Sequence, residues 1–578
     1  MVFLLQIVFT MKDFLKTLLA VVLGTGLVLY LVVTLIFGTI SSALNAFTGG
    51  VSVSIPAQAV LTIGFEEGVA NQDAQHPISG LLPAEFGLEP GGMGYYSYVR
   101  AIEAAATDPQ VTMIYLNPQY IQAQMAHLEE IRNALLFFRQ SGKPIVAYAD
   151  TYSQQAYYLA SAADKVTLNP AGEINLQGFS IQVRYYKELF DKWGIEAQVI
   201  RHGDYKGGGE NYILSQMSDT EREQFSAYLH DAWAHWAQGM ETSRHLPTGT
   251  LDSLCSTAFS FPAWEAHSIG LADELWYKDQ LIDYICAACN VKQERQIPTT
   301  SLATYAQKVA TQAKVKSPHK LALVYACGEM TVGQGTDGIF SENMAAQLRQ
   351  YRSDSTVKAV VLRVDSPGGD PLAAEIIARE LTLTAQVKPV VVSMGDMAAS
   401  GGYWISAPAH AIFANPSSLT GSIGVFSLFF NGQKALEDVL HIHNEIVNTH
   451  HSSHFPSYLT RIDDTQAAYL RQRVDSTYAR FIDVVATGRH LEKDAVEAVA
   501  QGRVWSGVQA VQNHLADQLG GLSDALRAAA MMANITDYNV VEYPQPESFL
   551  KRLVDMGAGY GLGVKTRLPF LDISVTSW

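Results

Sequence analysis

Ser400 stands between two alanines and two glycines in the stretch MAASGGYWIS. Small neighbours leave the backbone open to close approach by another molecule. The preceding stretch PVVVSM predicts a strand and the following residues have helical spacing, so Ser400 is predicted at a strand-to-helix turn. The N–H groups and dipole of a helix N-terminus favour negative charge there. Ser400 is therefore a candidate nucleophile, although no histidine or carboxylate close in the sequence is an obvious base.

A second glycine-rich turn lies upstream of Ser400, in VVLRVDSPGGD, residues 360–370. Two glycines after a parallel strand can present backbone N–H groups with no side chain in the way. Preorganised donors of this kind form oxyanion holes, although either turn can also be glycine-rich for conformational reasons alone. The Gly-x-Ser-x-Gly elbow of the α/β-hydrolases is absent, because Ala398 holds its first glycine position.

The chain contains a tandem duplication, visible as similar stretches at a nearly constant separation. TDPQVTMIYL matches SDSTVKAVVL, GKPIVAY matches VKPVVVS, SRHL matches GRHL, and LADEL matches LADQL. In both copies apolar strands alternate with helical stretches, which predicts an α/β fold with a largely parallel sheet. The predicted domains are an N-terminal anchor at 1–50, repeat one at 51–310, repeat two at 311–545 and a C-terminal tail at 546–578.

Comparison of the two copies supplies a candidate base for Ser400. In repeat one its place is held by glutamine, either Gln154 or Gln155, and the Pro-Gly-Gly is missing as well. Repeat one instead has Lys206, in VIRHGDYKGGGENY, where repeat two has a serine of the stretch THHSSH, Ser452 or Ser453. This complementary retention indicates one site shared by the two repeats.

A lysine can act as a general base only if its environment lowers its pKa toward the working pH. A Ser–Lys dyad is an established variant of serine catalysis. Taken without the duplication, Lys206 would be read as an ordinary solvated lysine. The sequence thus predicts a dyad of Ser400 and Lys206, with Lys206 removed from water.

The overall composition argues against several other classes of protein. The formal charge of −16 does not fit a nucleic-acid-binding surface. Four cysteines are too few for a disulfide scaffold, and the Cys-x-x-Cys of Cys286 and Cys289 falls in an apolar helical stretch. THHSSH, residues 449–454, lacks a matching carboxylate and reads as a polar loop. No metal and no cofactor are predicted.

The N-terminal region predicts a membrane anchor. No charged residue occurs from Thr17 to Phe65, and residues 17–40 have the length of one bilayer span. The apolar run is too long for a cleaved signal peptide. Lys12 and Lys16 precede it, which predicts a cytoplasmic N-terminus and a body on the other side. Met11 is an alternative start to Met1.

The motifs SPGG, MAASGGYWISAPAHAIFANPSSLTGSIGV and HGDYK, together with the anchor, closely resemble the signal peptide peptidase A (protease IV) family in its double-repeat form. The resemblance covers residues 55–530. It implies the spiral ββα fold shared with Clp protease and the crotonases, and a serine endopeptidase that degrades cleaved signal peptides. It implies Ser400 as nucleophile, Lys206 as general base, and the N–H groups of Gly369 and Gly401 as oxyanion donors, with Gly368 as the alternative to Gly369.

The resemblance also implies a homotetramer in the bacterial inner membrane, with its catalytic body on the periplasmic side and apolar peptides as substrates. This chain departs from the family in having Asp365 for asparagine, Asp396 for a common glycine, and three glycines after Lys206. Two other functions are weighed against the peptidase: a crotonase-type acyl-CoA enzyme and a non-catalytic membrane scaffold.

Overall fold

The computed structural model describes residues 54–66, 68–73, 93–119, 121–312 and 317–544. The predicted membrane span at 17–40 and the predicted tail at 546–578 lie outside the described residues. Within the described ranges, no helix is both long and apolar enough to cross a membrane. The described residues from Ile55 onward belong to one compact unit.

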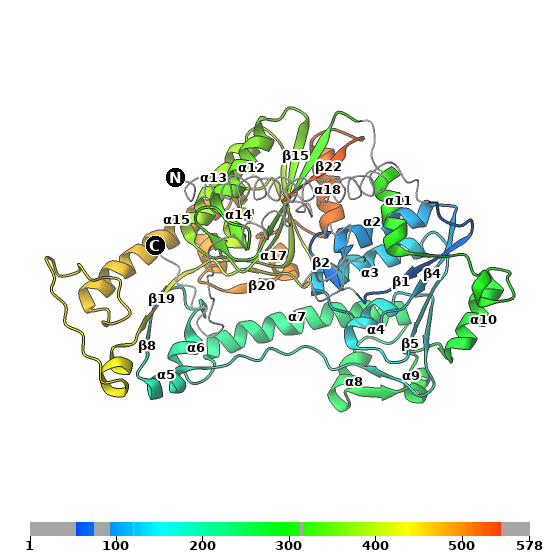
Figure 1. Ribbon diagram of the computed structural model, residues 1–578, viewed down its shortest axis with the longest axis horizontal. Coiled ribbons are helices and arrows are strands. Elements are labelled where there is room, and N and C mark those ends of the chain that lie inside the picture. Colours follow the sequence, from blue (N-terminus) through cyan, green and yellow to red (C-terminus); the bar gives the residue numbers. More distant parts are fainter. Residues whose placement is uncertain (1–53, 67, 74–92, 120, 313–316, 545–578) are drawn as a thin grey trace, which may run out of the picture. The chain divides into compact units, whose positions relative to one another are not determined.

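Repeat one is built on a parallel sheet with the strand order β10-β6-β5-β4-β1-β11 (Figure 1). Every neighbouring pair in it is parallel, as the alternation of strands and helices predicts. The strands are β1 (Ala59–Ile63), β4 (Val111–Leu116), β5 (Ile145–Ala149), β6 (Lys165–Leu168), β10 (Glu274–Leu275) and β11 (Thr299–Ser301).

Repeat two has a corresponding sheet with the order β20-β18-β16-β15-β12-β22, in which β17 also pairs with β16 and β21. Its pairs are parallel except β18 with β20. Nearly every residue of β15 is buried, as its continuous apolar sequence predicts for a strand covered on both faces. The strands are β12 (Lys320–Cys327), β15 (Val357–Ser366), β16 (Val390–Ala399), β17 (Ala411–Ala414), β18 (Leu419–Gly421), β20 (Val504–Ser506), β21 (Gln518–Leu519) and β22 (Asn539–Tyr543).

The same tertiary contacts recur in both repeats. Tyr157 donates a hydrogen bond to the carbonyl of Leu271, and Tyr403 donates one to the carbonyl of Leu515. The two tyrosines are 246 positions apart and the two leucines 244. The duplication found in the sequence is therefore also present in three dimensions.

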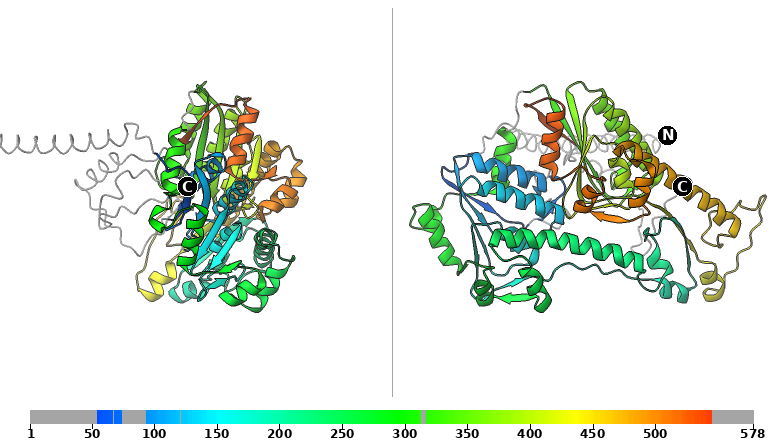
Figure 2. Two further views of the ribbon diagram at one scale, coloured as in Figure 1. Left: turned by 90° about the vertical axis from the view of Figure 1, so that its right-hand side faces the viewer. Right: turned by 180° about the vertical axis from the view of Figure 1, so that it is seen from behind.

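Each repeat carries one long helix of matching length, α7 (Asp219–Arg244) in repeat one and α15 (Asp464–Arg489) in repeat two. Each helix begins after a residue that caps its N-terminus, Ser218 or Asp463, by accepting a backbone N–H. In Figures 1 and 2, α7 extends from the helices of repeat one toward β20 of repeat two. It therefore connects the two repeats along one side.

The helix α3 (Met125–Arg139) of repeat one packs against repeat two through polar contacts. The carboxylate of Asp396, in β16, accepts the first N–H groups of α3, from Met125 and Ala126. Glu130 of α3 forms a buried ion pair with Arg363 of β15, with Nη1 and Oε1 2.7 Å apart. These contacts hold the two repeats in a defined relation, which a site shared between them requires.

Candidate active site

Ser400 lies at the junction of β16 and the short helix α14 (Gly401–Ser406). This confirms the predicted strand-to-helix turn. Its N–H donates to the carbonyl of Gly421 in β18, 2.9 Å away. Ser400 has φ = 55° and ψ = −118°, a conformation that residues with a side chain rarely adopt. Such strain persists where surrounding structure holds it, and is common at sites of chemistry.

A strand pair between the repeats brings Lys206 to Ser400. β8 (Glu196–His202) of repeat one pairs antiparallel with β19 (Val425–Asn431) of repeat two, with His202 opposite Val425 (Figure 1). The chain that leaves β8 toward Lys206 therefore runs beside the chain that enters β19 from Ser422. Because Ser400 is fixed to Gly421, the two residues converge although they are 194 positions apart.

Lys206 Nζ lies 3.1 Å from Ser400 Oγ. The lysine is 5% exposed, and burial lowers its pKa to about 7. At this pKa much of the side chain is a neutral amine near pH 7, with a lone pair that can accept a proton. Lys206 is therefore not an ordinary solvated lysine. Lys206 and Ser400, the residues predicted to form a dyad, lie within hydrogen-bonding distance of each other.

Ser422 is a site residue that the sequence did not single out. Lys206 Nζ donates to its carbonyl oxygen at 2.9 Å and lies 3.0 Å from its Oγ. These contacts fix the amine while it faces Ser400. The only signal in the sequence was its place in the stretch LTGSIG, where a serine has many ordinary roles.

Two glycines make room for the lysine side chain. A Cβ on Gly502, whose φ is 79°, would lie 2.6 Å from the Cβ and backbone nitrogen of Lys206. A Cβ on Gly424 would lie 3.1 Å from the Cδ of Lys206. Backbone atoms thus enclose the lysine, which explains how it is removed from water without a carboxylate partner.

The Pro-Gly-Gly turn lies directly beside Ser400. A Cβ on Gly368 would be 2.7 Å from the nitrogen of Gly401 and 3.1 Å from Ser400 Oγ, so a side chain there would cover both groups. The N–H of Gly368 is already bonded to Ser366 Oγ at 3.1 Å. Within the described residues the N–H of Gly369 forms no hydrogen bond, and Gly401, the first residue of α14, has no helical acceptor for its own.

The three departures from the family pattern all have structural roles. Asp365 accepts the N–H of Met397, and Asp396 caps α3 as described above. Burial raises the pKa of Asp396 to about 6. Each of the glycines that follow Lys206 is closely packed, since added Cβ atoms would meet the side chains of Glu221, Phe426 and Val199. None of these residues contacts Lys206 Nζ in the described structure.

In repeat one, the position that corresponds to Ser400 is occupied by a glutamine whose side chain is used in hydrogen bonds to a neighbouring loop. The matching tyrosines, Tyr157 and Tyr403, place Gln154 rather than Gln155 opposite Ser400 in the alignment. The Gln154 side chain accepts the N–H groups of Gln177 and Gly178 and donates to the carbonyl of Gly178. It is thus used to hold a loop.

The Cys-x-x-Cys of repeat one lies at the end of a helix. Cys286 lies in α10 (Lys278–Ala288) with Cys289 at its end, and all four cysteines are free. In the part of the chain that the structure describes, no group of histidine, cysteine or carboxylate side chains is arranged to hold a metal ion.

Comparison with known proteins identifies the family. The family model described as "Peptidase family S49" matches the chain twice, at residues 137–292 and at residues 382–536, which is once in each repeat. The chain belongs to peptidase family S49. Protease 4 of Salmonella typhi is 34% identical over 82% of this chain and 77% of its own length. Protease 4 of Haemophilus influenzae is 30% identical over 90% of this chain and 85% of its own length.

These relatives indicate a serine protease of the signal peptide peptidase type, and they do not favour the acyl-CoA enzyme or the non-catalytic scaffold. The chloroplastic serine protease SPPA of Arabidopsis thaliana is 30% identical over 82% of this chain and 71% of its own. A ClpP1 mutant from Listeria monocytogenes aligns with 35% of this chain and 94% of its own, at a TM-score of 0.24 and 14% identity. A likeness this slight supports no conclusion about function.

Proposed function

We propose that this member of family S49 is a membrane-anchored endopeptidase that cleaves apolar peptides, in particular signal peptides released from secreted precursors. Ser400 is the nucleophile and Lys206 the general base. The observation that carries this proposal is the 3.1 Å separation of Lys206 Nζ and Ser400 Oγ, with the lysine buried and its pKa lowered to about 7. A base with a pKa near the working pH is the most effective one for proton transfer.

In the proposed reaction, Ser400 Oγ attacks the scissile carbonyl carbon and its proton passes to Lys206 Nζ. The tetrahedral oxyanion is stabilised by the N–H groups of Gly369 and Gly401. Gly369 is preferred to Gly368 because the N–H of Gly368 is bonded to Ser366 Oγ. The protonated lysine then donates to the leaving amine, and an ester forms between the peptide acyl group and Ser400.

Water completes the cycle in the second half of the reaction. Lys206, neutral again, takes a proton from a water molecule that attacks the ester carbonyl, and the proton passes to Ser400 Oγ as the acid product leaves. Ser422 keeps the amine in place beside Ser400 in both halves, since its carbonyl and hydroxyl oxygens both lie within hydrogen-bonding distance of Nζ. The chain's own residues supply each proton transfer.

The membrane span at 17–40, the spiral ββα fold of the Clp proteases and crotonases, and a homotetramer are part of the same proposal. So is a location in a bacterial inner membrane, with the catalytic body on the periplasmic side. The uncharged sequence from Thr17 to Phe65 supports the anchor. An anchor would keep the site close to the bilayer, where released signal peptides reside.

The test uses the full chain in a mild detergent and a synthetic peptide with an apolar signal-peptide core. We expect cleavage by the native chain, and loss of cleavage by at least about 1,000-fold in Ser400→Ala and at least about 100-fold in Lys206→Ala. A matched peptide whose apolar core is replaced by polar residues should be cleaved more slowly. Full cleavage by either variant would refute the dyad, and equal cleavage of both peptides would refute the substrate class.

A further inference from the structure

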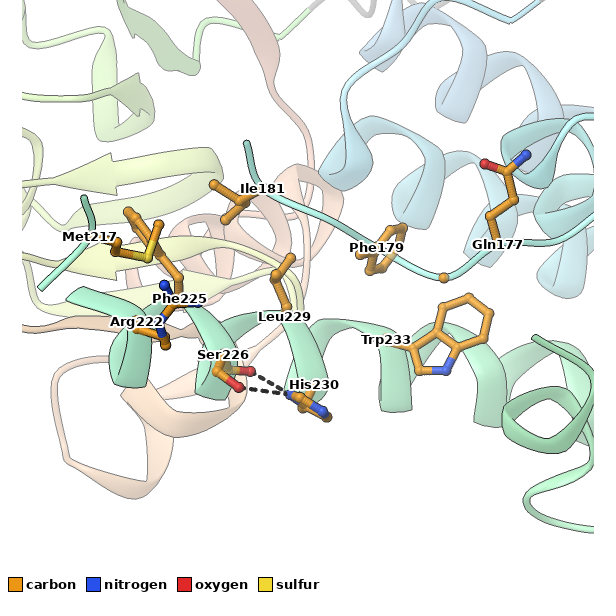
Figure 3. A pocket seen from close by; sticks show the side chains of 11 residues that line it. Gln177, Phe179, Ile181, Met217, Arg222, Phe225, Ser226, Leu229, His230 and Trp233 are labelled. Carbon is orange, nitrogen blue, oxygen red and sulfur yellow. Dashed lines mark hydrogen bonds between the residues drawn. The ribbon is translucent and has the colours of Figure 1, made fainter. Parts of the chain in front are cut away.

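The long helix α7 presents two different faces. Figure 3 shows one of them, where side chains such as Phe225 and Leu229 line an open groove with a volume of about 470 Å³. The second face is polar and carries Gln224, Tyr228 and Asp231, which are four and three positions apart and therefore lie on one side of the helix. Each of these three residues makes a hydrogen bond to repeat two.

This polar face attaches α7 to the part of repeat two that contains β18 and β20. The hydroxyl of Tyr228 donates to the carbonyl of Ser417 at 3.0 Å, just before β18 begins. The carboxylate of Asp231 accepts a hydrogen bond from the hydroxyl of Ser506, in β20. The third contact is made by Gln224, whose side chain is buried in this junction, with the residue 4% exposed.

The side-chain amide of Gln224 bridges two backbone groups that belong to different repeats. Its Nε2 donates to the carbonyl of Tyr205 at 3.0 Å, and its Oε1 accepts the N–H of Val504 at 3.1 Å. A carbonyl requires a donor and an N–H requires an acceptor, so one orientation of the amide satisfies both groups. A glutamine provides both functions at the end of one side chain.

The two bridged backbone groups are both adjacent to the dyad. Tyr205 directly precedes Lys206 in the chain. Val504 lies opposite Gly421 in the pair of β20 and β18, and the carbonyl of Gly421 accepts the N–H of Ser400 at 2.9 Å. The amide therefore connects the peptide group before the lysine to the strands that hold the serine.

The peptide group after Lys206 is held by a different side chain. Arg201 Nη1 donates to the carbonyl of Lys206 at 3.0 Å, and it also pairs with the buried carboxylate of Glu210. The lysine backbone is thus held on both sides. Loss of one of these contacts should displace the lysine side chain and should not release the whole loop.

The duplication supports a role for the glutamine at the dyad. Residues of α7 and α15 correspond at a separation of 245, since the helices begin after the capping residues Ser218 and Asp463. Gln224 therefore corresponds to Tyr469, which is 55% exposed. The bridging glutamine is present in the copy that contains Lys206 and absent from the copy that does not.

We propose that Gln224 is a positioning residue, which sets the distance between Lys206 Nζ and Ser400 Oγ by fixing the peptide group of Tyr205 to β20. The residue is buried and hydrogen-bonded on both sides, so it acts through the lysine and not through the substrate. The inference rests on the proposed function, because a positioning residue of this kind matters only if the dyad is the catalytic unit.

The first test replaces Gln224 by methionine, which has a similar size but neither donates nor accepts these hydrogen bonds. We expect Gln224→Met to lower kcat for the signal-peptide substrate by about 10- to 100-fold with KM nearly unchanged, because only the proton transfer is misaligned. Labelling of Ser400 by a fluorophosphonate should slow by a similar factor. Its pH midpoint should rise above the native value near 7, because a displaced lysine is less completely removed from water.

The second variant, Gln224→Glu, keeps the shape of the side chain and changes only its hydrogen bonding. A carboxylate opposes the Tyr205 carbonyl with a second acceptor, whereas the protonated acid has one donor and one acceptor, as the amide does. The labelling rate relative to the native chain should therefore rise as the pH is lowered from 9 to 6. Charged groups beside the bridge are the same in both chains, since Glu223 and Arg503 pair with each other at 3.1 Å. If Gln224→Met does not fold, this ratio decides, and a constant ratio would overturn the inference.

The matched control is Gln154→Met. The Gln154 amide also donates to a backbone carbonyl and accepts backbone N–H groups, but all of them belong to repeat one. Its kcat and labelling rate should stay near the native values, and melting temperatures measure the stability cost in both methionine variants. An equal fall of kcat in the two variants would overturn the inference.

Lys206→Ala is labelled in parallel, so that failure of the inference and failure of the proposed function can be distinguished. Native-rate labelling of Lys206→Ala would refute the dyad and the inference with it. Slow labelling of Lys206→Ala, together with native kcat and an unchanged pH midpoint in Gln224→Met, would overturn the inference alone.

Discussion

The amine of Lys206 is enclosed by oxygen acceptors and glycine backbone rather than by a counter-ion. Its Nζ contacts Ser400 Oγ and both oxygens of Ser422, and burial is the cause of its lowered pKa. The neutral form is thereby favoured in the folded chain. The same arrangement makes the charged form unfavourable, so the property that suits a general base also costs stability.

Replacement of Lys206 by methionine is expected to stabilise the fold while it abolishes activity. The pKa is about 7 in the folded chain and has its ordinary value of 10.5 when unfolded, so the unfolded chain binds more protons between these values. Native stability contributed by this group therefore rises with pH across that range. The gain from Lys206→Met should be largest at pH 6, up to about 5 kcal/mol, and smaller at pH 9. Thermal melting at both pH values measures it.

The matched control is Lys292→Met, a change at an exposed lysine. Its melting temperature should differ little from that of the native chain at either pH. An unchanged or lowered melting temperature for Lys206→Met at pH 6 would show that the lysine is not held in an unfavourable environment.

The site is assembled by elements from both repeats, and β8 is the one that brings Lys206 to Ser400. Its pairing with β19 sets the position of the chain from Gly203 to Lys206 against the chain from Ser422 to Gly424. Gly502 closes this junction from a third direction, with its φ of 79° and no space for a side chain. Small changes in these loops should therefore act on catalysis more than on the fold.

Gly502→Ala is expected to lower kcat/KM by at least about 100-fold, because the new methyl group would displace Lys206 from Ser400. Gly249→Ala is the matched control. Gly249 has φ = 84°, so alanine meets the same backbone strain, but no atom lies within 4 Å of the added Cβ. Peptide hydrolysis by the control should stay near the native rate. Native activity in Gly502→Ala would contradict the packing described for the lysine.

Much of this element-level arrangement could be predicted from the sequence. The apolar runs of β1, β12, β15 and β16 and the turn at Ser400 were expected, because local patterning encodes strands, helices and turns. The pairing of β8 with β19 was not predicted, because partner choice between distant strands has no local signal. Ser422 was missed for a related reason, since its role depends on the lysine that this pairing brings to it.

The comparison of the two repeats did predict that Lys206 and Ser400 lie together. What the sequence left open was the choice between adjacent residues, such as Gly368 and Gly369 or Gln154 and Gln155. Those choices depend on which N–H or side chain faces the site, and only backbone geometry shows this. In the structure the N–H of Gly368 is bonded to Ser366, and Gln154 holds the loop at Gly178.

At the scale of the whole molecule, catalysis requires the two repeats to keep one relative position. The buried pair of Glu130 and Arg363 lies at their contact, with side chains 4% and 1% exposed. Glu130 also accepts the N–H of Leu522 and a hydrogen bond from Asn415. One carboxylate of repeat one thus binds three separate segments of repeat two.

Arg363→Met is expected to destabilise the protein by about 3–5 kcal/mol, because it leaves the Glu130 carboxylate buried without its cation. The double variant Glu130→Leu with Arg363→Met should recover part of this loss. Lys187→Met, which removes the exposed ion pair with Asp191, is the control and should cost less than about 1 kcal/mol. Hydrogen exchange should show the loss in both repeats, and a loss confined to one repeat would contradict the coupling.

The most direct test of the dyad is the rate at which a fluorophosphonate labels Ser400 as the pH is varied from 5 to 9. The rate should rise about tenfold per pH unit at low pH and level off near pH 7, because the proposed base is the neutral amine of Lys206, whose pKa is about 7. In Lys206→Ala the rate should fall by at least about 100-fold and the plateau near pH 7 should disappear. A Lys206→Ala chain that labels at the native rate, with the native pH profile, would contradict the account.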